Sequence, residues 1–467
     1  MLARTCLLFT LLLNVTHTSA QQFIGMSANT QFGQISMLPL NPSFVVKPEN
    51  GIELNVFSGS LVFGTNAYNF SKEWFTGGLS RDSTITDTYT RDLRKKKKHL
   101  WGNADIIGPA VSFTLKEHHF GVYTRIRQIA RGGNLSFDAF QFIGPTSDLV
   151  SFPDTTSFKE AGFTAHTFGE LGFTYGRQLG SDLERVFKIG FTVKYVAGIA
   201  AGTLYTQNID QVKNNDDSTN LLKGDLTALY SENFNAYIDN DASNDMGSWF
   251  NRGGKGGLGF DIGMQYEYHP GAQIGYDKPY TFRLAAAITD IGSIAYRADT
   301  GSGQYKVNIV QKADWHFQRK PFEDFASYFH RLKQDTLMSQ TDSSKTFRVG
   351  LPTALRINTD LNLSSNFWVA TGIVLNMRGN AGGIYKPGYV NMLNITPRYE
   401  NSWFMVGLPI TFLGYQTVTV GAVLRAGPFY IGSSSIISTA LRKELNNFDA
   451  YAGLSLRFPK KGGAYTY

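Results

Sequence analysis

The sequence predicts an all-β protein: a transmembrane, antiparallel up-and-down β-barrel of about fourteen strands with a short N-terminal plug-like segment. Three observations predict it. The 467-residue chain begins like an exported protein, no later segment approaches the roughly 18 consecutive apolar residues of a spanning helix, and long runs alternate apolar with small or polar residues. In lipid, only helices and closed barrels pair every backbone group, so alternation without an apolar helix indicates a barrel.

Residues 1–20 have the features of a cleaved secretory signal peptide. Arg4 gives the positive start, residues 7–13 form a short apolar core, and Thr18-Ser19-Ala20 ends in small residues. A membrane anchor would need about 20 apolar residues, which this run does not reach. A lipoprotein would need a cysteine after the cleavage point, where Gln21 stands. We therefore expect an exported chain that begins at Gln21.

Composition excludes several classes of site. The single cysteine, Cys6, lies inside the predicted signal, which rules out disulfides, cysteine zinc sites and thiol catalysis in the mature chain. The net charge of +7 is modest, and the one dense basic run in the sequence is Arg94-Lys95-Lys96-Lys97-Lys98. We favour a solvated loop for this run over a contact with lipopolysaccharide, and expect no nucleic-acid partner.

Two runs show the alternation most clearly, residues 187–199 and residues 258–268. In each, every second side chain is apolar and most of those between are small, polar or charged. Neighbouring side chains of a strand face opposite sides, so one set should face lipid and the other the lumen. In the second run the expected lipid-facing residues are Leu258, Phe260, Ile262 and Met264, and the lumen-facing ones are Asp261, Gln265 and Glu267.

The predicted strands are separated by gaps that alternate between long and short. An even number of strands places both ends of the barrel sequence in the periplasm, beside the short turns. The strands are 52–64, 105–115, 120–130, 161–179, 186–199, 257–269, 280–296, 346–361, 367–377, 391–399, 403–412, 417–426, 429–436 and 447–458. The long gaps, expected outside the cell, are 65–104, 131–160, 200–256, 297–345 and 378–390.

Aromatic residues and prolines refine this topology. Aromatic rings suit the membrane interface, and they flank two short turns: Tyr266, Tyr268 and Tyr280 at one, and Tyr399, Trp403 and Phe404 at the other. Prolines at 352, 397 and 409 are expected to mark bulges or strand ends. A secreted soluble β protein is the alternative, but its strands would be shorter and its wet face richer in charge.

These observations divide the chain into four predicted regions. Residues 1–20 are the signal peptide, 21–50 a plug-like segment, 51–458 the barrel and 459–467 a periplasmic tail. The segment 21–50 lacks alternation and contains the turn signal Asn41-Pro42, so we expect it within or across the periplasmic mouth. The last strand ends on Phe458 and resembles the C-terminal signal read by the barrel-insertion machinery, although the tail departs from the usual pattern.

Four stretches carry a likeness to a known family. They are residues 40–44, residues 169–175 leading into 191–198, residues 259–263 with 288–292, and residues 420–429. The chain resembles an uncharacterised outer-membrane β-barrel family of Bacteroidota, itself similar in shape to the long-chain fatty-acid channel and the type IX secretion shuttle barrel. The resemblance implies the fold and the cell outer membrane as location.

Enzyme signatures are weak. Tyr205-Thr206-Gln207 matches the first motif of outer-membrane phospholipases, but the later His before Ser-Asn-Gly is missing. His118-His119 fits a polar turn better than a metal pair, because adjacent strand positions face opposite sides. The glycines around Lys255 lack the spacing of a phosphate loop and fit a loop that enters a strand. We therefore predict no enzyme and no catalytic, cofactor-binding or metal residues.

Two functions remain. The first is a passive channel or transporter for small solutes, hydrophobic ones included, because about fourteen strands enclose a lumen too wide for barrel side chains alone to fill. The alternative is a structural or accessory barrel that docks a secretion or surface-protein complex through residues 200–256 and 297–345. Expected partners are outer-membrane lipid, lipopolysaccharide and, during assembly, the insertion machinery.

Overall fold

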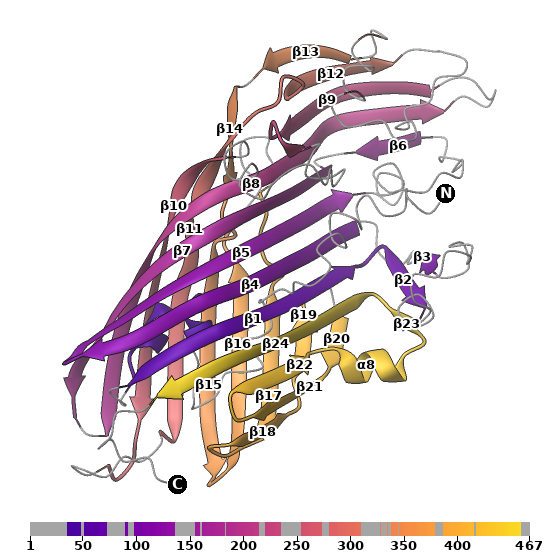
Figure 1. Ribbon diagram of the computed structural model, residues 1–467. Coiled ribbons are helices and arrows are strands. Elements are labelled where there is room, and N and C mark those ends of the chain that lie inside the picture. The colour runs from indigo at the N-terminus through magenta and orange to yellow at the C-terminus, as the bar shows by residue number, and fades with distance from the viewer. Residues whose placement is uncertain are drawn as a thin grey trace.

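The computed structural model forms a closed antiparallel barrel of 14 wall strands (Figure 1). It begins at β1 (Ile52–Thr65) and closes where β1 pairs with the last strand, β24 (Asn447–Phe458). The predicted up-and-down barrel is confirmed. The structure describes residues 35–47, 51–71, 89–91, 98–135, 155–158, 161–182, 184–213, 220–234, 254–272, 280–309, 327, 334, 338–343, 345–378, 386–414 and 417–458.

Every predicted strand is present in the wall, and three of them are split in two. Between β1 and β24 the wall contains, in order, β4 (Lys98–Leu115), β5 (His118–Leu135), β7 (Ala161–Ser181), β8 (Arg185–Lys213), β10 (Gly254–Tyr268), β11 (Phe282–Arg297), β14 (Thr346–Gly350) with β15 (Ala354–Ser364), β16 (Phe367–Asn376), β17 (Met392–Glu400), β18 (Phe404–Gly407) with β19 (Ile410–Leu413), β20 (Thr417–Val420) with β21 (Ala422–Ala426), and β22 (Phe429–Ser433).

The prolines lie where the sequence suggested irregular strands. Pro352 separates β14 from β15, and Pro409 separates β18 from β19. Pro397 stays inside β17 but lies opposite the second break, where its carbonyl accepts a hydrogen bond from the Leu408 backbone N–H at 3.0 Å. The missing proline N–H groups thus fall at places where the ladder is interrupted anyway.

Several predicted loops are wrong, because they contain strands that extend the sheet past the barrel (top of Figure 1). β8 continues to Lys213 instead of ending near 199, and it pairs with β9 (Asn220–Tyr230) and β6 (Thr155–Phe158). β12 (Gly303–Ile309) and β13 (Met338–Ser343) continue that sheet from β9. The predicted strand ends where the apolar alternation ends, because a strand that continues beyond the membrane needs no lipid-facing apolar residues.

Two further predictions need correction. Lys98, placed in a solvated loop by sequence, is the first residue of β4 and is buried, with its ammonium 3.4 Å from the Asn66 carbonyl; residues 94–97 lie outside the described residues. The strand predicted over 429–436 ends at Ser433, and a helix, α8 (Ile436–Leu441), follows. A helix of six residues is too short to show a helical period in sequence. A small sheet of β2 (Tyr68–Ser71), β3 (Tyr89–Arg91) and β23 (Glu444–Leu445) lies at the same end.

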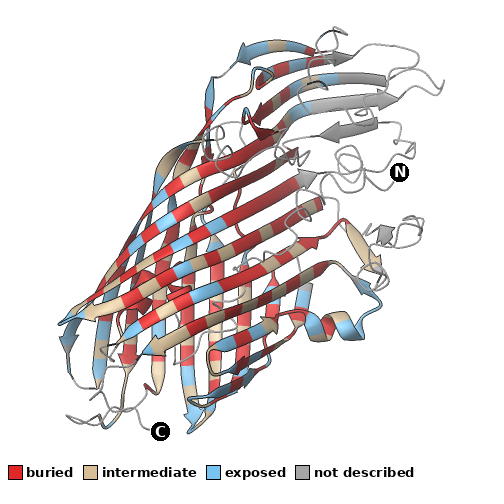
Figure 2. Ribbon diagram, in the orientation of Figure 1, coloured by how far each residue is buried: buried red, intermediate tan, exposed pale blue. Residues whose placement is uncertain are grey.

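Burial alternates along the wall as a membrane-spanning barrel requires, and Figure 2 shows the bands of exposed and buried residues. Ile262 is 58% exposed on the outer face, while Asp261 next to it is 2% exposed. The predicted assignment of Leu258, Phe260, Ile262 and Met264 to the outer face, and of Asp261, Gln265 and Glu267 to the lumen, is confirmed. The apolar outer belt is that of an outer-membrane-type barrel.

The aromatic prediction holds for one short turn and fails in part for the other. Tyr399, Trp403 and Phe404 are exposed on the outer face. Tyr280 instead is buried, and its hydroxyl donates to Asp360 Oδ2 at 2.7 Å. It precedes β11, so the strand alternation does not fix its direction. Among the described residues, no helix is long and apolar enough to cross a membrane.

The short connections lie at the end of the barrel where β1 begins and β24 finishes, as the strand parity predicts. This gives a test of orientation. An epitope tag at Asp216, between β8 and β9 and outside the described residues, should be detected on intact cells. A tag at Gly271, between β10 and β11, should be detected only after the outer membrane is permeabilised. The reverse pattern would show that the short turns face outward.

Candidate functional site in the barrel lumen

Residues 35–47, here called the N-terminal segment, lie inside the barrel. They form two short 3-10 helices, η1 (Ile35–Met37) and η2 (Pro42–Val45), and every residue from 35 to 46 is buried. The segment packs against β1, β4, β5, β7, β8 and β10. Of the segment predicted to be plug-like, residues 35–47 lie in the lumen, while residues 21–34 and 48–50 lie outside the described residues.

Asn41 both shapes the segment and fixes it to the wall. Its side-chain oxygen accepts hydrogen bonds from the Ser43 N–H at 2.9 Å and the Ser43 hydroxyl at 2.7 Å, which caps η2. Its amide nitrogen donates to the carbonyls of Met264 at 3.4 Å and Ala286 at 3.2 Å, on β10 and β11. One buried side chain thus ties the turn signal Asn41-Pro42 to two wall strands.

Glycines make room for this segment on four successive wall strands. Each of them faces the lumen beneath the segment, and a Cβ atom added at any one would collide with it. These glycines therefore have a specific cause, the close approach of the segment: its backbone at Gly190 and its side chains at the other three. The pairs are Gly121 with Leu38, Gly176 with Val45 and Val46, Gly190 with Pro42, and Gly263 with Asn41.

Much of the remaining contact between segment and wall is apolar. Burial of apolar side chains on both sides removes them from water, which favours the inserted position. The wall residues beneath the segment would line an apolar compartment if the segment left. The cluster joins Ile35, Met37, Leu38, Phe44, Val45 and Val46 of the segment to Ile107, Ala110, Tyr123 and Ala285 of the wall.

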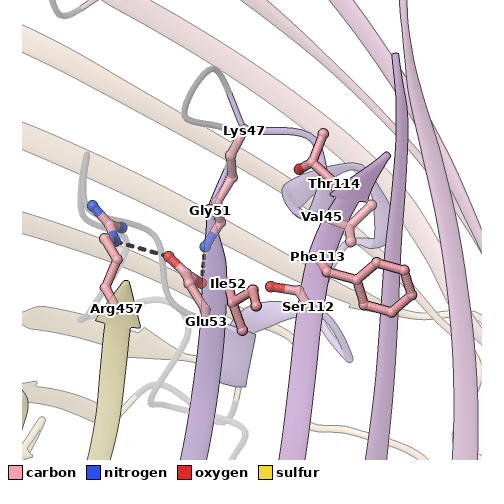
Figure 3. A pocket seen from close by; sticks show the side chains of 9 residues that line it. All are labelled: Val45, Lys47, Gly51, Ile52, Glu53, Ser112, Phe113, Thr114 and Arg457. Atoms are coloured by element: carbon pink, nitrogen blue, oxygen red, sulfur yellow. Dashed lines mark hydrogen bonds and ion pairs between the residues drawn. The ribbon is translucent and has the colours of Figure 1, made fainter. Parts of the chain in front are cut away.

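An ion-pair clamp holds the point where the segment leads into the wall (Figure 3). Lys47, at the end of the segment, forms an ion pair with Glu53 of β1. Arg457 of β24 donates from Nε to the other oxygen of Glu53 at 2.9 Å. Glu53 is buried, so the clamp lies on the seam that closes the barrel and ties the segment to it.

A layer of ion pairs lies in the lumen next to the segment, on the side away from the short turns. It is here called the central network. It draws lumen-facing side chains from six successive wall strands, and all are nearly fully buried. Four acidic and three basic groups balance closely, as buried charges require. The members are Asp105 (β4), Arg125 and Arg127 (β5), Glu170 (β7), Lys194 (β8), Asp261 (β10) and Asp290 (β11).

Asp290 is the hub of the central network. Arg127 donates from Nη1 to its Oδ1 at 2.9 Å and from Nη2 to its Oδ2 at 3.2 Å. The Lys194 ammonium lies 2.6 Å from Asp290 Oδ1 and 2.8 Å from Asp261 Oδ1. Asp290 has a left-handed backbone, with φ of 60°, a conformation that aspartate tolerates better than most residues. Arg127 also donates from Nη1 to Glu170 Oε1, at 2.8 Å.

A second network lies on the other side of the barrel, towards the short turns. Arg398 of β17 binds both oxygens of Asp360, at 2.7 and 2.8 Å, in the bidentate geometry that guanidinium favours. Its Nε also donates to Glu400 at 2.8 Å. The guanidinium of Arg283 lies over the Phe44 ring of the N-terminal segment, 5.3 Å from its centroid. The lumen is thus filled by ion pairs and by the segment.

The described residues that precede β17 also enter the lumen. Residues 378–390 are predicted to form an extracellular loop, and the described part of the connection does lie at the end away from the short turns. Yet residues 387–390 are buried, and the Tyr389 hydroxyl donates to Asp290 Oδ2 at 3.1 Å. Nothing in the sequence around Tyr389 indicates this inward fold, since its contacts come from distant strands.

The weak motifs acquire structural roles. His118 and His119 begin β5 on opposite faces; His118 contacts the Tyr175 hydroxyl at 2.8 Å and His119 the Thr114 hydroxyl at 3.0 Å. Gly254 starts β10, as expected for a loop that enters a strand. Within the described ranges, no group of three or more His, Cys, Asp or Glu residues is placed to hold a metal ion.

Comparison with known proteins assigns the family. One family model matches residues 42–434, from the N-terminal segment to the end of β22. The chain belongs to DUF5723. That family is described as one of unknown function, so membership in DUF5723 gives a relationship without an activity. No curated protein matches the DUF5723 chain.

Solved structures similar to this DUF5723 barrel are distant in sequence. A FadL homologue of Pseudomonas aeruginosa is 9% identical with a TM-score of 0.41, over 95% of this chain and 99% of that one. The toluene transporter TbuX of Ralstonia pickettii is 10% identical with a TM-score of 0.39, over 95% and 99%. The P. putida toluene transporter TodX is 10% identical with a TM-score of 0.40, over 91% and 94%. Likenesses this distant leave the function of the DUF5723 chain open.

Proposed function

We propose that this protein is a passive outer-membrane channel for small solutes, hydrophobic ones included, and that the N-terminal segment closes it. One observation carries the proposal. The segment fills a lumen compartment whose wall is apolar and carries glycines where the segment approaches it most closely. The segment itself belongs to no wall strand. A mostly apolar pocket with a few polar groups is the usual form of a small-molecule site.

The way the segment is held supports a removable closure. The wall is closed by backbone pairing from β1 round to β24, which does not involve the segment. The polar ties of the segment to the wall include the two Asn41 bonds and the Lys47–Glu53 ion pair. Withdrawal of the segment would therefore expose the apolar compartment and leave the ring of strands intact.

Deleting residues 21–46 should test this directly. The signal peptide would be kept, and the variant should show a conductance in planar bilayers several-fold above that of the full-length chain, because the segment no longer fills the lumen. A chain that lacks only residues 459–467 serves as the control and should conduct like the full-length protein. A folded deletion variant, verified by heat-modifiable migration, that conducts no better than full length would contradict the channel proposal.

A docking function is the second candidate, and the sheet that extends past the barrel favours it. β9, β12 and β13 continue the barrel wall beyond its membrane-spanning part, where a partner could reach them. Purification from native membranes in mild detergent separates the two candidates. A stable partner protein would support docking, and a solitary barrel that carries bound lipid would support transport.

A further inference from the structure

Residues 386–391, here called the inward loop, form a second element that occupies the lumen. They precede β17 in the connection from β16, at the end of the barrel away from the short turns. Residues 387–390 are all buried, and Tyr389 is 3% exposed. A polar connection that lies inside a barrel needs partners for its backbone and side chains, and those partners show where it reaches.

The inward loop crosses the lumen to the opposite wall. In the ring of 14 strands, β16 and β17 are the ninth and tenth and β5 is the third, so β5 lies about half a turn away. Arg127 and Arg131 of β5 nevertheless bind the loop: Arg127 Nη2 donates to the Tyr389 hydroxyl, and Arg131 Nη1 donates to the Gly388 carbonyl at 3.4 Å. The loop therefore spans the barrel.

Tyr389 is fixed from several strands at once. Besides its bond to Asp290 on β11, its ring lies under the guanidinium of Arg356 on β15, at 4.8 Å from the centroid, and of Arg127, at 5.9 Å. Cation–π contacts of desolvated arginines add to the hydrogen bonds. The same ring belongs to an apolar cluster with Val62 and Trp101 on β1 and β4. Tyr389 thus occupies the middle of the lumen.

The inward loop and the N-terminal segment are separate obstructions. The segment bonds to the carbonyl of Ala286 on β11, and the loop bonds to Asp290, four residues farther from the short turns. At about 3.3 Å per strand residue, these anchor points lie roughly 13 Å apart along the strand. Removal of the segment would leave the inward loop and the central network in place.

We propose that the inward loop is the constriction of the channel, which sets its size limit and favours anions; this rests on the proposed function above. The charge preference follows from the side chains that contact the loop. Three of them are arginines, Arg127, Arg131 and Arg356, and one is an acid, Asp290. Asp290 is already shared by Arg127 and Lys194, and no hydrogen-bond partner is seen for Nη1 of buried Arg356 among the described residues.

The test uses the 21–46 deletion as its background. Tyr389→Ala should raise single-channel conductance by about twofold or more and admit larger sugars in liposome swelling, because it removes the ring at the centre of the lumen. Tyr389→Phe keeps the ring and should give a smaller rise. Arg356→Gln should shift the reversal potential in a KCl gradient towards lower anion preference. Arg348→Gln, on the exposed face of β14, is the matched control and should leave the reversal potential unchanged.

The possible outcomes separate this inference from the proposed function. A background that conducts above the full-length chain, and whose conductance and size limit rise further when Tyr389→Ala is added, supports the inward loop as the constriction. A background that conducts freely, with the same size limit whether residue 389 is Tyr or Ala, overturns the constriction and leaves the channel function standing. Folded variants that never conduct overturn both proposals.

Discussion

Replacing Asp290 with alanine should lower the free energy of unfolding by about 3–5 kcal/mol, because loss of one partner leaves buried charges uncompensated. Arg127 and Lys194 would both stay buried without the carboxylate that they share. Asp290→Asn should cost less, since an amide can still accept from both. Denaturant unfolding in detergent micelles, followed by tryptophan fluorescence, would measure the difference.

A surface ion pair of similar length provides the control. Arg177 and Glu117 are 2.8 Å apart, but their side chains are 45% and 75% exposed. Solvent screens such a pair, so Glu117→Ala should cost at most about 1 kcal/mol. If Asp290→Ala cost no more than Glu117→Ala, the central network would be well hydrated, and the lumen around it would hold water instead of packed side chains.

The outer face of the wall was predictable because lipid imposes a rule on each strand separately. Every second residue of a spanning strand must be apolar, so the direction of Leu258, Ile262 and Met264 follows from their own stretch of sequence. The same rule explains the failures. Residues after Ile199 continue β8 without the alternation, and Tyr280 precedes its strand, so neither is governed by lipid contact.

The lumen was not predictable in the same way, because its contacts join strands that are far apart in sequence. Arg127 and Asp290 are separated by 163 residues, and Arg127 and Tyr389 by 262. Their pairing depends on the register of each intervening strand and on curvature that a single sequence does not display. Asp261, Gln265 and Glu267 could be assigned to the lumen, but not to Lys194 or Lys188 as partners.

The N-terminal segment falls between these cases. The turn signal Asn41-Pro42 and the lack of alternation indicated a segment outside the wall. What held it could not be foreseen, since the four glycines that receive it are spread over residues 121–263 and look like ordinary glycines of a barrel. In the structure all four lie against the N-terminal segment, and Gly263 supports a further prediction.

Two neighbouring residues of β10 should separate the stability of the wall from closure of the lumen. Ile262 points outward near the middle of the strand, so Ile262→Arg should destabilise the barrel by about 2–4 kcal/mol if it lies near the bilayer midplane. Gly263 faces inward, and Gly263→Val would place its side chain where Asn41 lies. We expect that variant to expel the N-terminal segment and to conduct like the 21–46 deletion.

The wall itself should tolerate Gly263→Val, because valine suits a strand better than glycine and the added atoms enter the lumen, not the ladder. Its loss of unfolding free energy should therefore be well below that of Ile262→Arg, as measured by denaturant titration, while its bilayer conductance rises. A variant that keeps the wild-type conductance would show that the segment shifts to accommodate the side chain. Equal destabilisation by both variants would instead mean that the segment contributes to wall stability as much as lipid contact does, and that closure is structural.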